Sequence, residues 1–246
     1  MHASSSLYIV TGASRGLGRA LSEQLAANGA TVLGLSRTAP PGPPGLEQWA
    51  VDLGDPVPVG QRLRQWLSAF APDRWSEATL INNAALITAP APLSDTPLSA
   101  LSTAARVGLE APLVLSAAFL DATRGWAGVR RVLHVSSGLG RRAMASAAAY
   151  CAVKAGLDHL ARAQALEEAL RPHGARVCSL APGVIDTDMQ VQLRGADAED
   201  FPDVEVFRQM KSGGRLDSPA TAAAKLLAYL QRTDFGAKAV GDVREP

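Results

Sequence analysis

Cysteine is scarce in this sequence, and so is any excess of charge of one sign. Only Cys151 and Cys178 are present, and their separation is not that of metal ligands. The 24 basic and 23 acidic side chains leave a formal net charge of +1. A protein that binds nucleic acid or an anionic membrane usually carries a stronger field. We therefore expect no metal site, no nucleic acid or membrane partner, and a reduced cytoplasmic setting.

Long uninterrupted apolar runs are also missing. A membrane-spanning helix needs about 18 apolar residues, and no stretch approaches that length. The opening segment, "MHASSSLYIVTGAS", lacks a basic region, and its short apolar run leads into a glycine turn, so we do not expect a signal peptide. Hydrophobic residues nevertheless make up 47% of the 246 residues, which is enough for a sizeable core.

Strand-like and helix-like segments alternate along the chain. Strands are predicted at 7–10, 31–36, 49–53, 78–84, 129–137, 175–183 and 238–242. Helices are predicted at 19–29, 97–122, 147–171 and 218–231. Such alternation predicts an α/β fold in which right-handed crossovers wind a parallel sheet doubly, with helices on both faces. Because neither an internal repeat nor a linker is visible, we predict one domain over residues 1–246.

The segment "TGASRGLG" (11–18) follows the first strand and opens a helix. Gly12, Gly16 and Gly18 let the backbone turn tightly and approach a phosphate, and a helix N-terminus offers free amides to that anion. A lone glycine pattern is weak, but here the strand before it and the helix after it favour a dinucleotide site over a merely structural turn.

The residues after the second strand indicate which dinucleotide is bound. NAD-binding sheets usually carry an acid there that holds the ribose 2′-hydroxyl. This chain has Ser36 and Arg37 instead, and Arg15 lies within the glycine loop. A guanidinium suits a 2′-phosphate, so we predict NADP(H). Asp52 follows the third strand and is either a partner of the adenine amine or a simple loop acid.

The segment "YCAVK" places Tyr150 and Lys154 one helical turn apart on the same face. A nearby cation lowers the pKa of a tyrosine, so this pair can serve as a proton donor tuned toward neutral pH. On spacing alone, the alternative is an ordinary surface pair.

Taken in order, the glycine loop, "NNAA" (82–85), "SS" (136–137), "YCAVK" (150–154) and "PG" (182–183) resemble the classical short-chain dehydrogenase/reductase family. The resemblance implies a single Rossmann domain with a seven-stranded parallel sheet, and a homodimer or homotetramer. It also implies catalytic roles. Tyr150 corresponds to the general acid/base, Lys154 to the residue that lowers the Tyr150 pKa and holds the nicotinamide ribose, and Ser137 to the serine that hydrogen-bonds the substrate carbonyl.

The same resemblance implies a cofactor site. Asn83 and Ala84 correspond to residues beside the adenosine, and Ile185 and Thr187 to residues near the nicotinamide carboxamide. The implied NADP(H)-binding residues are Gly12, Ser14, Arg15, Gly16, Leu17, Gly18, Ser36, Arg37, Asp52, Leu53, Asn83, Ala84, Ala85, Tyr150, Lys154, Pro182, Gly183, Ile185, Thr187 and Met189. The implied substrate-binding residues are Ser137, Tyr150, Gly183 and Asp242.

The C-terminal third of the chain indicates which members of this family it resembles. The segments "LAPGVIDTDMQ" (180–190) and "FGAKAVGDVRE" (235–245) are similar to sepiapterin reductases and to reductases of aromatic diketones such as benzil. Asp242 corresponds to the aspartate that anchors a pterin, although an exposed acid near a chain end is the plain alternative. The charged segment 194–214 is expected to be either a substrate lid with a hinge at Gly213 and Gly214 or a solvated loop.

Two positions depart from the family pattern. Ala85 stands where the family usually has glycine, and Gly108 stands where it has an asparagine that extends the proton relay. We predict an NADPH-dependent carbonyl reductase acting on a small ketone or vicinal dicarbonyl. Two alternatives stay open. One is a 3-oxoacyl-carrier-protein reductase or alcohol dehydrogenase of the same family, and the other is a non-catalytic NADP sensor.

Overall fold

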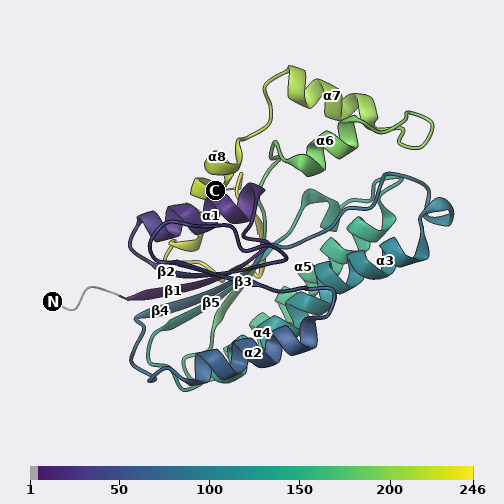
Figure 1. Ribbon diagram of the computed structural model, residues 1–246. Coiled ribbons are helices and arrows are strands. Elements are labelled where there is room, and N and C mark those ends of the chain that lie inside the picture. The colour runs from purple at the N-terminus through teal and green to yellow at the C-terminus, as the bar shows by residue number, and fades with distance from the viewer. Residues whose placement is uncertain (1–4, 246) are drawn as a thin grey trace.

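A seven-stranded parallel sheet forms the centre of the molecule (Figure 1). The computed structural model describes residues 5–245, so Pro246 and the first four residues of the N-terminal segment discussed above lie outside it. The strands are β1 (Ser6–Thr11), β2 (Thr31–Ser36), β3 (Leu46–Ala50), β4 (Glu77–Asn82), β5 (Val129–Val135), β6 (Arg176–Ala181) and β7 (Val240–Asp242). Their order, β3-β2-β1-β4-β5-β6-β7, winds outward in both directions from β1 and β4. The predicted doubly wound fold is therefore confirmed.

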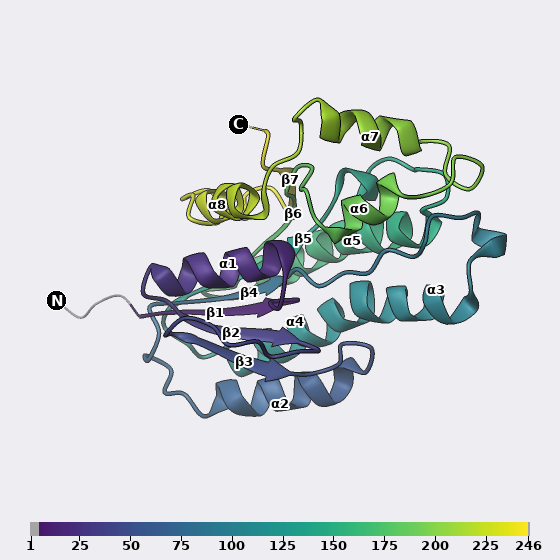
Figure 2. The same cartoon turned by 45° about the horizontal axis from the view of Figure 1, so that its top comes forward.

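Helices cover both faces of the sheet (Figures 1 and 2). They are α1 (Gly16–Ala27), α2 (Pro56–Ser68), α3 (Leu98–Ala105), α4 (Ala111–Ala122), α5 (Ala148–Ala169), α6 (Asp188–Arg194), α7 (Val204–Ser212) and α8 (Pro219–Leu230). The short turns are η1 (Leu93–Asp95), the π-helical η2 (Arg106–Glu110) that joins α3 to α4, and η3 (Gly138–Gly140). Helices α1 and α8 pack side by side on one face, and α2, α4 and α5 cover the other.

Alternating side chains of β1 supply both halves of the core. Leu7 and Ile9 join the apolar cluster under α2 and α4, whereas Tyr8 and Val10 join the cluster under α1 and α8. All four are at most 2% exposed. A strand buried on both faces is typical of a covered parallel sheet, and it leaves only the strand ends free to carry function.

The prediction of elements requires two corrections, one to a strand and one for a helix that was not predicted. The third strand spans Leu46–Ala50 rather than 49–53, because Leu46 already pairs with Val32 of β2. Helix α2 was not predicted, since its opening "PVPVG" has the composition of a loop. Proline is tolerated there because the first turn of a helix has no use for the missing N–H group.

The helix that runs through α3, η2 and α4 corrects the expectation that no segment is long and apolar enough to span a membrane. Leu98–Ala122 is long and apolar enough to cross a membrane by length and composition alone, with 44% of its most apolar window buried inside the protein. Its inward side chains Leu115 and Phe119 have no exposed area and belong to the core under α2. Core helices commonly pass this compositional test, so it decides nothing about a membrane.

Helices α6 and α7 stand above the carboxyl edge of the sheet, at the upper right of Figure 1. The chain leaves and re-enters the body of the protein at one point, where Ile185 forms a parallel bridge with Asp217. The Asp186 amide donates to the Asp217 carbonyl, and the Asp217 amide donates to the Val184 carbonyl, both at 2.9 Å. The Asp186 side chain binds Arg194 of α6 and Lys211 of α7, so it ties both helices to this base.

Candidate active site

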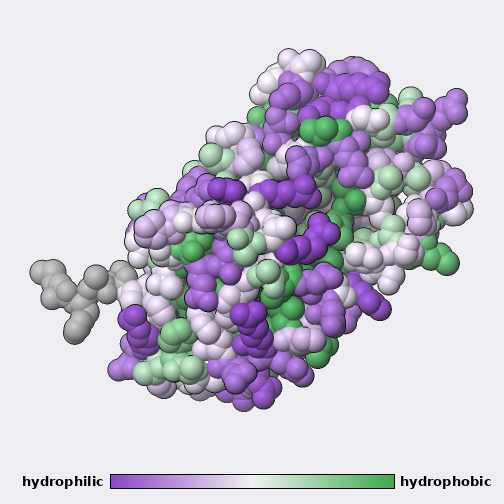
Figure 3. Space-filling model, in the orientation of Figure 1, coloured by the Kyte–Doolittle hydropathy of each residue, from purple (hydrophilic) through white to green (hydrophobic). Residues whose placement is uncertain are grey.

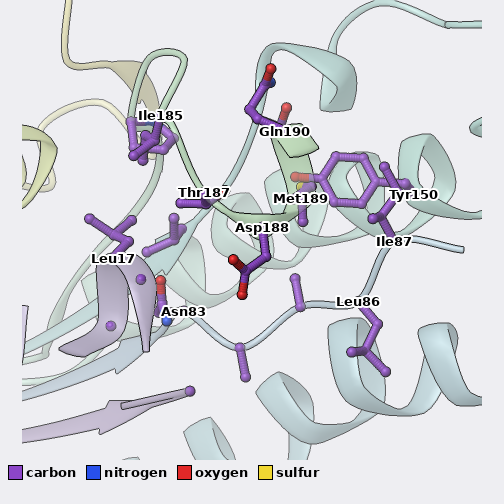
Figure 4. A pocket seen from close by; sticks show the side chains of 18 of the residues that line it. Leu17, Asn83, Leu86, Ile87, Tyr150, Ile185, Thr187, Asp188, Met189 and Gln190 are labelled. Carbon is purple, nitrogen blue, oxygen red and sulfur yellow. The ribbon is translucent and has the colours of Figure 1, made fainter. Parts of the chain in front are cut away.

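A cavity of about 1750 Å³ runs along the carboxyl edge of the sheet. In Figure 4, Leu17 and Asn83 lie at one end, Tyr150 and Ile87 at the other, and Thr187 lies between them. The cavity opens where the strand order reverses, which is the usual ligand position in an open α/β sheet. It exceeds the few hundred Å³ of a typical small-molecule pocket, so it can hold a dinucleotide and a substrate together.

The glycine loop lines one end of this cavity. Gly12 and Gly16 have φ values of +71° and +57°, which side chains rarely adopt. A Cβ atom on Gly18 would lie 2.3 Å from the Gly12 carbonyl oxygen. Helix α1 begins after Arg15, whose side chain makes no capping hydrogen bond, so the first amides of the helix are free for an anion. These features fit the pyrophosphate of a dinucleotide.

Asn83 braces this loop. Its side-chain amide donates to the Thr11 carbonyl oxygen at 2.8 Å, and the backbone amides of Asn83 and Ala84 both donate to Thr11 Oγ1 at 2.9 Å. The residues that the sequence places beside the adenosine therefore also fix the end of β1 against the end of β4.

The cationic end of the site lies at β2. Arg37 follows the strand, lines the cavity and has no ion-pair partner within residues 5–245. Arg15 instead reaches across to Asp188, with its Nη1 2.7 Å from Oδ2. One oxygen of Asp52 accepts from the Gly54 amide at 2.8 Å, and Asp52 also lines the cavity. Of the two guanidinium groups predicted to meet a 2′-phosphate, Arg37 is thus the one with no competing carboxylate among the described residues.

Three consecutive residues at the carboxyl end of β5, Val135 to Ser137, contact three successive turns of α5. The Lys154 ammonium donates to the Val135 carbonyl oxygen at 2.7 Å, the Ser136 hydroxyl donates to Asp158 at 2.6 Å, and the Ser137 hydroxyl lies within hydrogen-bonding reach of Tyr150. This pairing brings Ser137, Tyr150 and Lys154 together on the cavity wall.

Burial controls the ionisation of Tyr150 and Lys154, the predicted catalytic pair, in this structure. It raises the pKa of Tyr150 to about 12, against an opposing hydrogen bond with Ser137. It lowers the pKa of Lys154 to about 8, against the opposing charge of Asp158. The Lys154 nitrogen lies 5.5 Å from the Tyr150 ring centre. The expectation of a lowered Tyr150 pKa is therefore not met here, because the loss of hydration outweighs the hydrogen bond with Ser137. At neutral pH Tyr150 carries the proton that a reduction needs.

Most of the residues predicted for the site do line the cavity. They are Gly12, Ser14, Arg15, Gly16, Leu17, Gly18, Ser36, Arg37, Asp52, Leu53, Asn83, Ala84, Ala85, Ser137, Tyr150, Lys154, Pro182, Gly183, Ile185, Thr187 and Met189.

Asp242 is the exception. It does not line the cavity, and its carboxylate accepts hydrogen bonds from the Arg244 backbone amide and guanidinium at 2.6–3.0 Å. Arg244 takes its place on the cavity wall. The expected direct contact between Asp242 and a substrate is corrected accordingly, because Arg244 already occupies both carboxylate oxygens.

Gly108 occupies the buried turn η2, where the family pattern has the relay asparagine. A Cβ atom at Gly108 would lie 2.5 Å from Cγ1 of Val153. Val153 is the residue just before Lys154, so its branched side chain fills the space that an asparagine at position 108 would need.

The wall beyond Tyr150 is largely apolar. Ile87, Leu139, Met189, Leu193 and Phe207 line it, and the last three come from α6 and α7. Figure 3 shows a broken run of hydrophobic residues down the middle of this face, with hydrophilic residues on either side. A ligand at this end would meet this apolar cluster together with the polar side chains of Arg142, Gln190 and Arg194.

Sequence reasoning missed two polar residues of the site. Asp158 is 2% exposed and follows Lys154 by one further turn, so the repeat of the four-residue spacing was an available signal. Gln190 on α6 lines the cavity, is 7% exposed, and its carbonyl oxygen has no partner among the described residues. No cluster of metal-ligating side chains occurs within residues 5–245.

This chain is similar over most of its length to a known family and to two kinds of reductase. Residues 6–198 match the family described as short chain dehydrogenase. The chain is 35% identical over 227 residues to a benzil reductase ((S)-benzoin forming) of Bacillus subtilis (strain 168), which covers 92% of this chain and 93% of that enzyme. It is 32% identical over 246 residues to a sepiapterin reductase of Rattus norvegicus, with 92% of each chain covered.

Solved structures of similar enzymes share the fold of this chain over almost its whole length. The KRED1-Pglu enzyme superposes with a TM-score of 0.82 at 26% identity, over 96% of this chain and 100% of that one. A putative NAD(P) dependent gluconate 5-dehydrogenase from Beutenbergia cavernae, solved with bound NADP, gives a TM-score of 0.76 at 28% identity, over 97% and 94% of the two chains. The chain described here belongs to the short-chain dehydrogenase family of oxidoreductases, which act on CH–OH and C=O groups with NAD(P)(H).

Proposed function

We propose that this protein is an NADPH-dependent reductase of small ketones, with aromatic vicinal dicarbonyls such as benzil as its preferred substrates. The observation that carries the proposal is the placement of Ser137 and Tyr150 where the cofactor end of the cavity meets the apolar wall. A flat aromatic ketone gains free energy by burying its rings against such a wall.

The residues divide the reaction between them. Bound NADPH would supply a hydride to the carbonyl carbon. Tyr150 donates its proton to the carbonyl oxygen as the C=O π bond breaks, which completes the alcohol. Ser137 hydrogen-bonds the same oxygen, where negative charge develops, and Lys154 stabilises the tyrosinate that remains. Arg37 would hold the 2′-phosphate.

The arrangement of the site favours a diketone over a pterin as the substrate. The carboxylate expected to anchor a pterin, on Asp242, is bound by Arg244 and lies off the cavity. The 35% identical relative from Bacillus subtilis is named for benzil, which agrees with the apolar wall.

A substrate panel tests this proposal. Purified protein with NADPH should reduce benzil with a kcat/KM at least tenfold above that for sepiapterin or for an acetoacetyl thioester. Preference for the thioester would favour an acyl-carrier reductase, and preference for sepiapterin would favour a pterin reductase. If none of the three oxidises NADPH while NADPH still binds, the non-catalytic alternative stands.

A further inference from the structure

The buried carboxylate of Asp158 lies near the catalytic residues but takes no part in the reaction steps assigned to them. Asp158 is 2% exposed and accepts hydrogen bonds from Ser136, which follows β5, and from Ser179 of β6, at 2.6 and 2.7 Å. Arg141 donates to its second oxygen at 3.2 Å and also to the Gly241 carbonyl of β7 at 2.7 Å. Asp158 therefore links α5 to the carboxyl ends of three neighbouring strands.

This link fixes the helix in register with β5. Asp158 binds Ser136, Lys154 one turn earlier binds the Val135 carbonyl oxygen, and Tyr150 two turns earlier binds Ser137. A slide of α5 along β5 would break all three contacts together. The contacts of Asp158 and Lys154 each involve a charged group, and such hydrogen bonds are stronger than a bond between neutral groups.

The carboxylate also supplies charge. Lys154 is only 2% exposed, and a buried cation is costly unless an anion compensates it. The titratable groups around the pair are Tyr150 on α5, His134 on β5, Cys178 on β6 and Arg141 after β5.

None of those groups supplies an anion near neutral pH. Burial lowers the pKa of His134 to about 4 and raises the pKa of Cys178 to about 12, so both are neutral. Tyr150 holds its proton, and Arg141 is a cation. Among the described residues, Asp158 is the one acid whose charge raises the Lys154 pKa.

We propose that Asp158 is a positioning residue of this site, whose carboxylate keeps Lys154 cationic and locks α5 in the register that places Tyr150 and Ser137. The catalytic part of this inference rests on the proposed function, but its effect on cofactor affinity does not.

The test replaces the carboxylate by its neutral isostere, Asp158→Asn, and measures the Kd of NADPH by fluorescence from pH 6 to pH 10. NADPH affinity should fall once Lys154 loses its proton, and we call the pH of this fall the alkaline limit of NADPH binding. Loss of the compensating charge should move this limit about one pH unit lower, which is the size of shift that a nearby charge produces. Glu168→Gln is the matched control, because Glu168 is also a buried, ion-paired acid of α5 but lies almost three turns beyond Asp158 and outside the cavity. Its pH limit should equal that of the wild type.

Arg141→Met provides a test in the opposite direction if Asp158→Asn does not fold. It removes a cation that competes for Asp158, so the alkaline limit should move to higher pH. An Asp158→Asn protein that is less stable but keeps the wild-type limit would reduce Asp158 to a structural role and overturn the proposal. So would an Arg141→Met limit that stays in place or falls. Failure to reduce any ketone would sink the proposed function while leaving this binding experiment intact.

Discussion

Tyr150 and Lys154 are buried side chains whose proton affinities diverge from their usual values in opposite directions. Burial raises the pKa of the phenol to about 12 and lowers that of the ammonium to about 8. In the protein without cofactor, Lys154 is therefore the first of the two to lose its proton as the pH rises. The alkaline limit of activity should follow Lys154, because a neutral lysine no longer stabilises a tyrosinate.

Cofactor choice is also decided by single residues. Arg37→Asp removes a phosphate partner and adds repulsion, so it should raise the Kd of NADPH at least tenfold and leave the Kd of NADH unchanged or lower. Arg162→Asp on the exposed side of α5 makes the same change in net charge and serves as the control. If the preference for NADPH survives in Arg37→Asp, a different residue selects the cofactor.

At the scale of single residues, the sequence predicts the site residues that form a recognisable local spacing pattern. The glycine loop and the Tyr150–Lys154 pair were found because each pattern is local. Asp158 continues the same four-residue spacing, but its partners Ser136 and Ser179 come from the end of β5 and from β6, and only the folded sheet shows that they converge. The placement of Asp242 came from the family resemblance, which does not show that Arg244, two residues further on, binds its carboxylate.

At the scale of elements, the contact between η2 and α5 decides whether the usual proton relay can exist. A side chain at Gly108 would collide with Val153 across this contact. Gly108 thus accommodates the branched side chain of Val153 beside Lys154.

Gly108→Asn alone should overpack this contact and destabilise the protein by about 1–3 kcal/mol. The double variant Gly108→Asn/Val153→Ala makes room for the asparagine, so its melting temperature should recover and its kcat should rise, most clearly at high pH. Val153→Ala alone is the control for the cavity that the smaller side chain leaves. A double variant as unstable as Gly108→Asn would show that Val153 is not the obstacle.

Element boundaries were predicted less well than element types. The alternation of strands and helices predicted the sheet correctly, because buried parallel strands are apolar and sharply bounded. The third strand was placed three residues too late, since only its pairing with β2 shows that Leu46 begins it. Helix α2 was missed because its two prolines are compatible with a first turn that the sequence pattern alone does not identify.

At the scale of the whole molecule, the remaining expectation is self-association. The family resemblance implies a homodimer or homotetramer, and α5 presents Leu166 and Leu170 to solvent one turn apart, 72% and 88% exposed. We expect sedimentation well above that of a 25.6 kDa monomer. The variant Leu166→Glu/Leu170→Glu should be monomeric, whereas Leu98→Glu on α3, which is equally exposed, should not. A monomeric wild type would contradict this expectation.

The reduction itself is tested most directly by comparing the wild type with Tyr150→Phe, using NADPH and benzil at neutral pH and following the absorbance of the reduced nicotinamide. The wild type should oxidise NADPH only when benzil is present and should form benzoin in equal amount. Tyr150→Phe should lose at least 99% of kcat, about 2.7 kcal/mol of transition-state stabilisation, while the Kd of NADPH stays within twofold. A Tyr150→Phe protein that keeps most of its kcat, or a wild type that binds NADPH and leaves benzil unreduced, would contradict the proposed function.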